Sequence, residues 1–515
     1  MNRWKVFLVV VGVVMGMSGE AQAVQATYHH SVLYGQSLSV GSHTYDEDYE
    51  GNPWDNDAIT SLTTNPGDDP TENNSYMFTE YEDDVNDLCG SGIRLSEDPG
   101  NSLISANLTD FSYLHDDLST THCNDFLPNH LWINGQTVGT PVAWMLHSLL
   151  GYHRMMVTEN GWGGKKISEL SQGTVPYINI KTTVQAAKDV AAGEGAEGNL
   201  NHVWAVFFTQ GEADQNKDET PTSRESYKNA LATLRTNLNT DLLAITQQAN
   251  QGGPTAIKMI VSQLSDWFKN EPTVPLAQLD AHKMGWPNDK VYVACPKYFL
   301  NYRPRPDGVS REPHLSAQST VLLGEYYAKA YYRWIFNAGT YDTKAKVGMA
   351  IHPESAILLT SGGNRTVNIN LNFYGCLPAS GRALVFDNDS NNANHNTYGD
   401  KFRPSDPTAT IDGVYNYRGL EFVGSTNDAK ISSAYVMASG KQVRVVLDKV
   451  PEGNTDDMFV RYAYSNPSVE TENPGRTTGP RGLLRDNDTD VESNYFPDFK
   501  LYNWALTFKQ EVTLQ

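Results

Sequence analysis

Up to about residue 337 the chain alternates short apolar runs with amphipathic segments. Because runs this uniformly apolar need cover on both faces, the pattern predicts a parallel sheet between layers of helices, an α/β fold. The predicted strands are Ser31–Tyr34, Met155–Thr158, Val203–Phe208, Ile257–Ser262 and Val291–Ala294.

Two of the intervening segments have a clear helical period. One places five apolar side chains on a single helical face: Tyr227, Leu231, Leu234, Leu238 and Leu242. Thr222 with Glu225 three residues later forms a capping-box pattern at its start. The other helix is predicted from Ser316 through to Trp334.

Beyond about residue 340 the period changes to short alternating runs separated by Gly, Asn and Asp. This predicts an all-β domain, a sandwich or jelly roll, over 345–515, after an α/β domain over 24–340. Its predicted strands include Thr366–Leu371, Val443–Leu447, Phe459–Tyr464 and Trp504–Phe508. Asn/Asp clusters at 387–396 and 485–490 lack the spacing of an EF-hand calcium loop, so we expect solvated turns there.

A segment at about 42–130 interrupts the α/β pattern. It is rich in Asp, Asn, Gly and Pro and has few periodic apolar positions. We interpret it as a loop-rich insertion folded over the edge of the sheet. In an oxidising compartment Cys89 and Cys123, which both lie in it, are expected to pair. Cys295 lies in an apolar run and is expected to be a buried free thiol.

The N-terminus has the pattern of an export signal over residues 1–23. Arg3 and Lys5 precede an apolar stretch, which ends before the small-x-small sequence Ala21-Gln22-Ala23. We therefore expect a secreted or periplasmic protein. The formal net charge of −21 argues against nucleic acid as a partner. No later apolar stretch predicts a membrane span.

Three polar motifs follow predicted strands, at the sheet edge where open α/β folds bind ligands. Gly35-Gln36-Ser37 follows the first, and a serine on such a turn exposes its hydroxyl and its own N–H. Taken alone, Ser37 is better interpreted as the N-cap of a helix. Gly163 and Gly164 follow the second, where glycines allow close backbone approach. Gln210-Gly211-Glu212-Ala213-Asp214 follows the third and sets an amide and two carboxylates there.

A histidine completes the set. Asp307 and His314 follow the last predicted strand, and His314 precedes the last helix. A lone histidine is more often structural than catalytic. With a serine after the first strand, however, it becomes a candidate general base.

Together these motifs resemble the SGNH hydrolase superfamily, specifically its sialate O-acetylesterase and acetylxylan-esterase-like branch. That branch typically shows Gly-Gln-Ser, Gly-Gly-Thr-x-Ile, Gln-Gly-Glu-x-Asp and Asp-x-x-His in this order. The resemblance covers roughly residues 28–337, apart from the insertion, and implies a three-layer α/β/α fold. It implies Ser37 as nucleophile, His314 as base, and oxyanion donors from the N–H groups of Ser37 and Gly163 and the Gln210 amide. No metal or organic cofactor is implied.

The chain departs from that pattern at two positions. Lys165 replaces the usual Thr, and Arg311 occupies the place three residues before His314. A guanidinium only donates hydrogen bonds, so another residue must accept from the histidine. Asp307 is favoured and Glu212 is second, while Glu312 is closer in sequence but is separated from His314 by Pro313.

The sequence thus predicts a secreted serine esterase that removes O-acetyl or similar short acyl groups from a carbohydrate or polysaccharide through an acyl-enzyme. Two alternatives stay open. One is a non-catalytic glycan-binding protein on a degenerate esterase fold, because the acid is displaced. The other is a lipid or thioester hydrolase, although no apolar lid is evident. The expected partner is an acetylated glycan, and the oligomeric state is not predicted.

Overall fold

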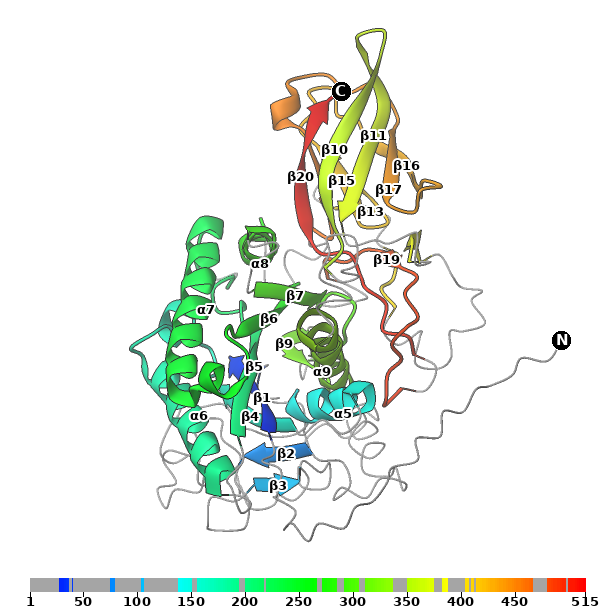
Figure 1. Ribbon diagram of the computed structural model, residues 1–515. Coiled ribbons are helices and arrows are strands. Elements are labelled where there is room, and N and C mark those ends of the chain that lie inside the picture. The colour runs from blue at the N-terminus through cyan, green and yellow to red at the C-terminus, as the bar shows by residue number, and fades with distance from the viewer. Residues whose placement is uncertain are drawn as a thin grey trace, which may run out of the picture.

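The computed structural model (Figure 1) contains an α/β part and a mostly antiparallel β part. The residues that it describes are 27–36, 39, 75–78, 103–105, 138–150, 155–193, 200–216, 219–265, 271–284, 291–304, 311–336, 350–374, 382–387, 403–406, 409–411, 414–465, 479–496 and 499–515.

The α/β part is built on a seven-stranded sheet with the order β3-β2-β4-β1-β5-β6-β7. All five predicted strands are present and parallel to one another. They are β1 (Thr27–Gly35), β4 (Met155–Gly161), β5 (Leu200–Thr209), β6 (Lys258–Gln263) and β7 (Val291–Pro296). Every residue of β7 is buried, as expected for a strand covered on both faces.

The predicted insertion contributes two edge strands to this sheet. β2 (Ser75–Phe78) pairs in parallel with β4, and β3 (Leu103–Ser105) pairs antiparallel with β2. These strands extend the sheet at the edge over which the insertion was expected to fold. Cys89 and Cys123 lie outside the described residues, whereas Cys295 is a buried free thiol, as predicted.

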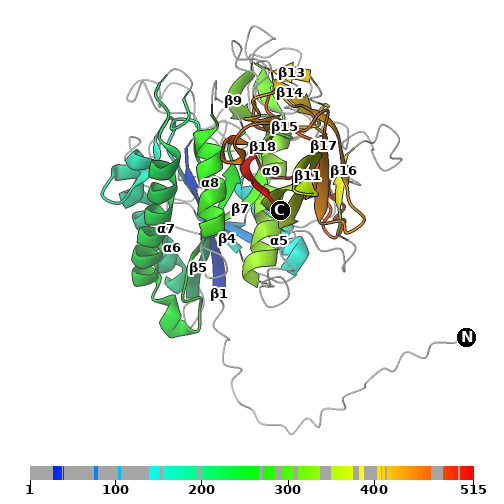
Figure 2. The same cartoon turned by 90° about the horizontal axis from the view of Figure 1, so that it is seen from above.

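Helices cover both faces of the sheet. Viewed from above (Figure 2), α6, α7 and α8 lie on one side of the strands, and α5 and α9 on the other. Their bounds are α5 (Gly139–Leu150), α6 (Val175–Gly193), α7 (Arg224–Thr246), α8 (Thr273–Met284) and α9 (Ala317–Tyr331), with short turns η2 (Ile167–Leu170), η3 (Gln248–Gln251) and η4 (Tyr332–Phe336). None of the helices in the described part is both long and apolar enough to span a bilayer.

The start of α7 differs from the prediction by one residue. The N-cap is Ser223, whose Oγ accepts a hydrogen bond from the Ser226 N–H at 3.2 Å. Thr222, the predicted cap, instead donates its hydroxyl to Asp214 Oδ1 at 2.6 Å. The predicted capping box was therefore wrong, because a tertiary partner engages the Thr222 hydroxyl. Ser316 caps α9, where the second helix was predicted to begin.

The β part contains one nine-stranded sheet with the order β13-β14-β15-β18-β20-β10-β11-β17-β16. Only β10 and β20 pair in parallel. The predicted strand Trp504–Phe508 was misplaced, since β20 begins at Phe508. The bounds are β10 (His352–Ser361), β11 (Asn364–Tyr374), β12 (Leu384–Phe386), β13 (Ala409–Ile411), β14 (Val414–Tyr417), β15 (Leu420–Val423), β16 (Ile431–Val436), β17 (Gln442–Leu447), β18 (Phe459–Tyr462), η6 (Thr455–Asp457), β19 (Leu484–Asp486) and β20 (Phe508–Leu514).

The two parts share one apolar core, which includes Val206 of β5 and Phe508 of β20. The Gln263 side chain, at the end of β6, accepts from Thr507 N at 2.7 Å and donates to Thr507 O at 3.0 Å. Tyr298 donates to the Ala505 carbonyl at 2.8 Å. The segment leading into β20 is thus hydrogen-bonded to the α/β part through its backbone.

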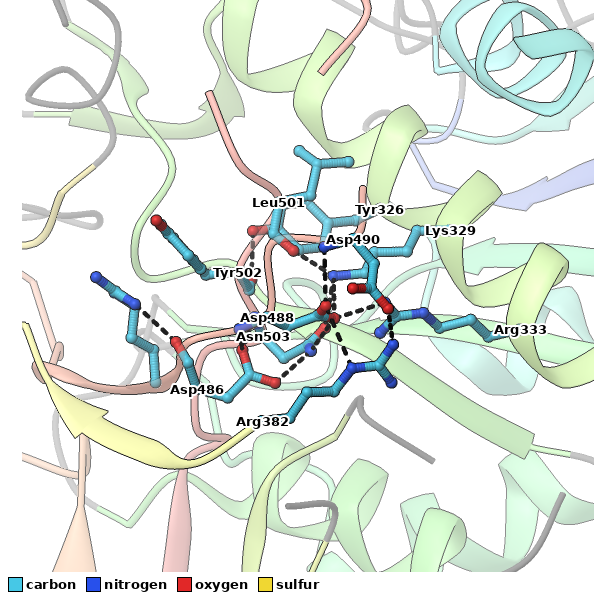
Figure 3. Close-up of polar contacts among 11 residues, drawn as sticks. Tyr326, Lys329, Arg333, Arg382, Asp486, Asp488, Asp490, Leu501, Tyr502 and Asn503 are labelled. Atoms are coloured by element: carbon cyan, nitrogen blue, oxygen red, sulfur yellow. Dashed lines mark hydrogen bonds and ion pairs between the residues drawn. The ribbon is translucent and has the colours of Figure 1, made fainter. Parts of the chain in front are cut away.

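A buried cluster of charges joins α9 to the C-terminal segment (Figure 3). The Asp488 carboxylate lies 2.5 Å from Arg333 Nη2 and 3.3 Å from Lys329 Nζ, and all three side chains are fully buried. Arg382 Nε approaches the same carboxylate at 3.4 Å. Asn503 donates to Asp488 at 3.1 Å and to Asp486 at 2.6 Å. The solvated turn predicted at 485–490 is therefore wrong for Asp486 and Asp488, which are buried, whereas Asn487 and Asp490 are exposed.

Burial alone would oppose ionisation of Asp488. Lys329, Arg333 and Arg382 more than offset that effect and hold the pKa of Asp488 below its ordinary value. Its neighbour Asp486 shows the opposite shift, because burial and the charge of Asp488 raise its pKa. Asp488 is thus the ionised centre of the contact between the two parts.

We expect Asp488→Asn to lower the free energy of unfolding by about 3–5 kcal/mol, because it leaves buried cations without their counter-ion. Urea unfolding at neutral pH measures the loss. Asp428→Asn is the matched control, since it removes a pair with Lys430 whose side chains are 77% and 41% exposed. It should change stability by less than about 0.5 kcal/mol.

The same pair of proteins gives a test by pH. Because the folded pKa of Asp488 lies below its unfolded value of about 3.9, its contribution is complete above that pH and is lost on acidification. The wild type should therefore lose stability below about pH 4 more steeply than Asp488→Asn. Equal slopes would show that Asp488 is not the ionised centre of the cluster.

Candidate active site

The first three predicted motifs meet at the carboxyl edge of the parallel sheet. Gly35, the last residue of β1, lies opposite Gly161 of β4 on one side and Thr209 of β5 on the other. The segments that follow these three strands therefore leave the sheet side by side. This neighbourhood follows from strand order, which the sequence did not reveal.

The turn after β1 is held tightly against β5. Gly35 has a φ of +138°, and a Cβ at this position would lie 2.1 Å from the Thr209 carbonyl oxygen. Gln36 N donates to that same carbonyl at 3.0 Å, and Trp162 N donates to Gly35 O at 2.9 Å. Only glycine permits this approach. Ser37, the predicted nucleophile, follows directly but lies outside the described residues.

The residues around Ser37 are also constrained on its C-terminal side. Ser39 donates both its backbone N–H, at 2.8 Å, and its hydroxyl, at 2.6 Å, to the Gln36 carbonyl. Gln36 and Ser39 are both buried. The backbone on either side of Ser37 is thus hydrogen-bonded within the turn.

The loop after β4 carries the predicted oxyanion donor Gly163, which is half-buried. Gly164 beside it has a φ of +66°, in the left-handed region. The loop then closes on the third motif, where Ile167 N donates to Asp214 Oδ2 at 2.7 Å. Asp214 therefore joins the second and third motifs.

Gln210 lies at the centre of the third motif and is buried. Its Nε2 donates to Asp214 Oδ2 at 2.6 Å and to the Lys165 carbonyl at 3.0 Å. Its Oε1 accepts from the Tyr227 hydroxyl at 2.7 Å. Burial raises the pKa of Tyr227 well above its usual value, so this hydroxyl remains a donor. Both N–H bonds of the amide are thus engaged within the protein.

Glu212 joins the first motif to the third. Its Oε2 accepts from Gln36 Nε2 at 2.5 Å, and its Oε1 forms an ion pair with Lys297 Nζ. The side chains of Glu212 and Lys297 are 5% and 1% exposed. Lys297 directly follows β7, so the pair reaches across β6 at the sheet edge.

His314 lies on β9 (Arg311–Leu315), which forms a hairpin with β8 (Tyr302–Pro304) after β7. It is half-buried and precedes Ser316, the N-cap of α9, by two residues. The histidine thus precedes the last helix, as expected, but it lies on a strand that the sequence did not predict. Asp307, the predicted partner of His314, lies outside the described residues. Glu312 precedes His314 by two residues on β9.

Sequence reasoning missed Lys297 and the bracing role of Asp214. A signal for Lys297 exists, because a charged residue directly follows the fully buried run of β7. In the described part of the chain, no three His, Cys, Asp or Glu side chains are grouped so that they could hold a metal ion. The groups that meet here are an amide, carboxylates and an ammonium.

No protein-family model matches the chain, and no curated protein matches it. Solved structures do match. A carbohydrate acetylesterase from Xanthomonas citri is 13% identical, with 90% of this chain and 81% of that chain covered and a TM-score of 0.45. An Arabidopsis thaliana protein is 18% identical over 60% of this chain and 98% of its own (TM-score 0.35), and NanS is 12% identical over 61% and 99% (TM-score 0.36). All three TM-scores are below 0.5, so these likenesses assign no function to this chain.

Gly35→Ala tests the close approach at the turn. The added Cβ would meet the Thr209 carbonyl, so we expect a loss of about 3 kcal/mol in stability together with loss of any activity at this edge. Gly173→Ala is the control, because Gly173 also has a positive φ, +92°, but open space around it. It should cost only about 1–2 kcal/mol. Equal losses in thermal unfolding would contradict the clash.

Proposed function

We propose that this protein is a serine esterase that removes O-acetyl or similar short acyl groups from a carbohydrate. The observation that carries the proposal is the hydrogen bond between Gln36 and Glu212. It joins the motif containing Ser37 to the Gln-Gly-Glu-x-Asp motif at the carboxyl edge of the sheet. The resemblance of these motifs to the SGNH superfamily supplies the reaction class.

In the proposed reaction His314 removes the proton of the Ser37 hydroxyl as its oxygen attacks the ester carbonyl. The tetrahedral oxyanion is held by the N–H groups of Ser37 and Gly163. As the carbon–oxygen bond to the sugar breaks, His314 protonates the departing sugar oxygen, which leaves as a hydroxyl, and an acyl-enzyme remains. Water, deprotonated by His314, attacks this ester, and Ser37 leaves as the alcohol with release of the carboxylic acid. Asp307 is proposed to orient His314.

Gln210 is proposed as the third oxyanion donor. Its bond to Asp214 is the shorter of the two, at 2.6 Å, so the amide stays there and its other N–H, now 3.0 Å from the Lys165 carbonyl, is the one that an oxyanion beside it would accept. Donors of this kind often tighten on the reacting group only in the complex.

The carbohydrate substrate and export are proposed on sequence grounds, from the motif set and from residues 1–23, which lie outside the described part. The glycan-binding alternative predicts retention of the glycan without turnover. The lipid or thioester alternative predicts faster turnover as the acyl chain lengthens. p-Nitrophenyl esters of increasing chain length, together with acetate release from acetylated polysaccharides, separate the three.

Ser37→Ala should abolish turnover of p-nitrophenyl acetate, by about 10⁴-fold or more, because it removes the nucleophile. The thermal unfolding of the variant should match the wild type. A fluorophosphonate probe should label the wild type at Ser37, as read by peptide mass spectrometry. Labelling at another serine, or near-normal turnover by the variant, would refute the assignment.

Gln210→Ala should lower kcat by about 10²–10³ with little change in KM, because an oxyanion donor acts in the transition state. Asp214→Asn is the comparison. It weakens the hydrogen bonds of Asp214 to Ile167 N and to Gln210 but keeps the Gln210 side chain. A rise in KM alone, or equal loss in both variants, would make Gln210 a bracing or binding residue.

A further inference from the structure

We propose that Glu212 and Lys297 form a positioning pair, which holds Gln36 and through it the backbone of Ser37. Glu212 is then not the acceptor for His314, although its place in the sequence allowed that role. The inference rests on the proposed function, because its measured effect is on ester hydrolysis.

The carboxylate of Glu212 has one partner for each oxygen. Oε1 is paired with the Lys297 ammonium, and Oε2 accepts from Gln36 Nε2 at 2.5 Å. A triad acid needs an oxygen directed at the histidine ring and a charge to balance the imidazolium. Here the buried Lys297 ammonium already balances the negative charge of the Glu212 carboxylate. The pair is therefore suited to hold a neighbour rather than to support a proton transfer.

Lys297 is itself fixed from both sides. Its backbone N–H donates to Gln263 O at 3.1 Å and to Ser265 Oγ at 3.0 Å, and Gln263 is the last residue of β6. The ammonium thus projects from a rigid point over the end of β6 toward Glu212. Because the Lys297 backbone is fixed in this way, its ammonium holds the Glu212 carboxylate in one position.

Gln36 links the Glu212 carboxylate to the backbone that leads into Ser37. Its backbone N–H is bound to Thr209 O at 3.0 Å, and its carbonyl accepts from Ser39. Its Oε1 is buried and accepts no hydrogen bond from the described residues. Within that part of the chain, the bond from Nε2 to Glu212 is the polar anchor of the side chain. If it is lost, the residue preceding Ser37 is free to change rotamer.

A buried ion pair is weak support for stability, because desolvation offsets the attraction. Such pairs instead give a defined geometry, and departures from local rules collect at functional sites. The pair lies among the ends of β1, β5 and β7, beside Gln36, which directly precedes the predicted nucleophile in the sequence. Its location fits a role in geometry better than one in stability.

Two double variants separate the roles. Glu212→Gln with Lys297→Met removes both charges but keeps an amide oxygen that can accept from Gln36. Glu212→Leu with Lys297→Met removes the charges and the acceptor. We expect the first to retain kcat on p-nitrophenyl acetate within about tenfold and the second to lose about 10²-fold, as misplacement of a reacting group does. Their melting temperatures should be similar.

The pH profile of kcat/KM gives an independent reading. Its acid limb reports the base His314, and Glu212→Gln with Lys297→Met should leave that limb in place. If Glu212 were the acceptor for His314, loss of its charge would lower kcat by about 10⁴ and move the limb to lower pH. Either of these results overturns the inference.

The matched control removes a buried pair elsewhere. Glu421, fully buried in β15, pairs with Arg461 of β18 at 2.7 Å, and neither residue belongs to the sheet edge. Glu421→Gln with Arg461→Met should leave kcat unchanged. A loss there equal to that of Glu212→Leu with Lys297→Met would show a general effect of buried pairs and overturn the inference.

Gln36→Leu tests the same step if the Leu double variant does not fold. It keeps the ion pair and removes the donor, so kcat should again fall about 10²-fold. If the wild type hydrolyses esters and Gln36→Leu has a normal kcat, the positioning role is overturned and the proposed function still stands. Absence of both ester turnover and probe labelling in the wild type overturns the proposed function, and the positioning role falls with it.

Discussion

Glu212 and Lys297 form an ion pair in which both side chains are almost fully buried, and this contact joins the segments of the candidate active site. One carboxylate from the end of β5 binds a side chain after β1 and an ammonium after β7. Three strands of a parallel sheet are thereby joined at their carboxyl ends, across β6, which lies between β5 and β7. Asp214 does the same between the β4 and β5 loops, through Ile167 N and Gln210. The loops of the site are therefore held by charged groups that have little access to water.

The β part is bound to the same edge. Gln263 is hydrogen-bonded through its side chain to Thr507 of the C-terminal segment and through its carbonyl to Lys297 N. Asp488, between Lys329 and Arg333, joins the same segment to α9, the helix that follows His314. With a shared apolar core, these contacts hold the C-terminal part against the α/β part.

Local pattern predicted the elements well where one physical cause acts alone. The five parallel strands were predicted because burial on both faces demands continuous apolar runs, and Ser316 was predicted at the start of α9. Prediction failed where two causes compete. Thr222 and Ser223 both suit an N-cap, and the bond from Thr222 to Asp214 decides between them. The Asp-rich stretch at 485–490 has the composition of a solvated turn, but Arg333 and Lys329 pair with Asp488 in the interior. No local pattern predicts this pairing, because the two cations lie 150 residues or more earlier in the chain.

The sequence by itself determined the fold class, the five parallel strands of the α/β part and the motifs that follow them along the chain. It did so because side-chain periodicity and turn chemistry are local properties. Only the tertiary structure decided which motifs are neighbours, since strand order in the sheet places β5 beside β1 and β7 two strands further on. It also decided that Glu212 lies between Gln36 and Lys297. A carboxylate's partners are set by which distant segments are packed against it, and no local pattern records that packing.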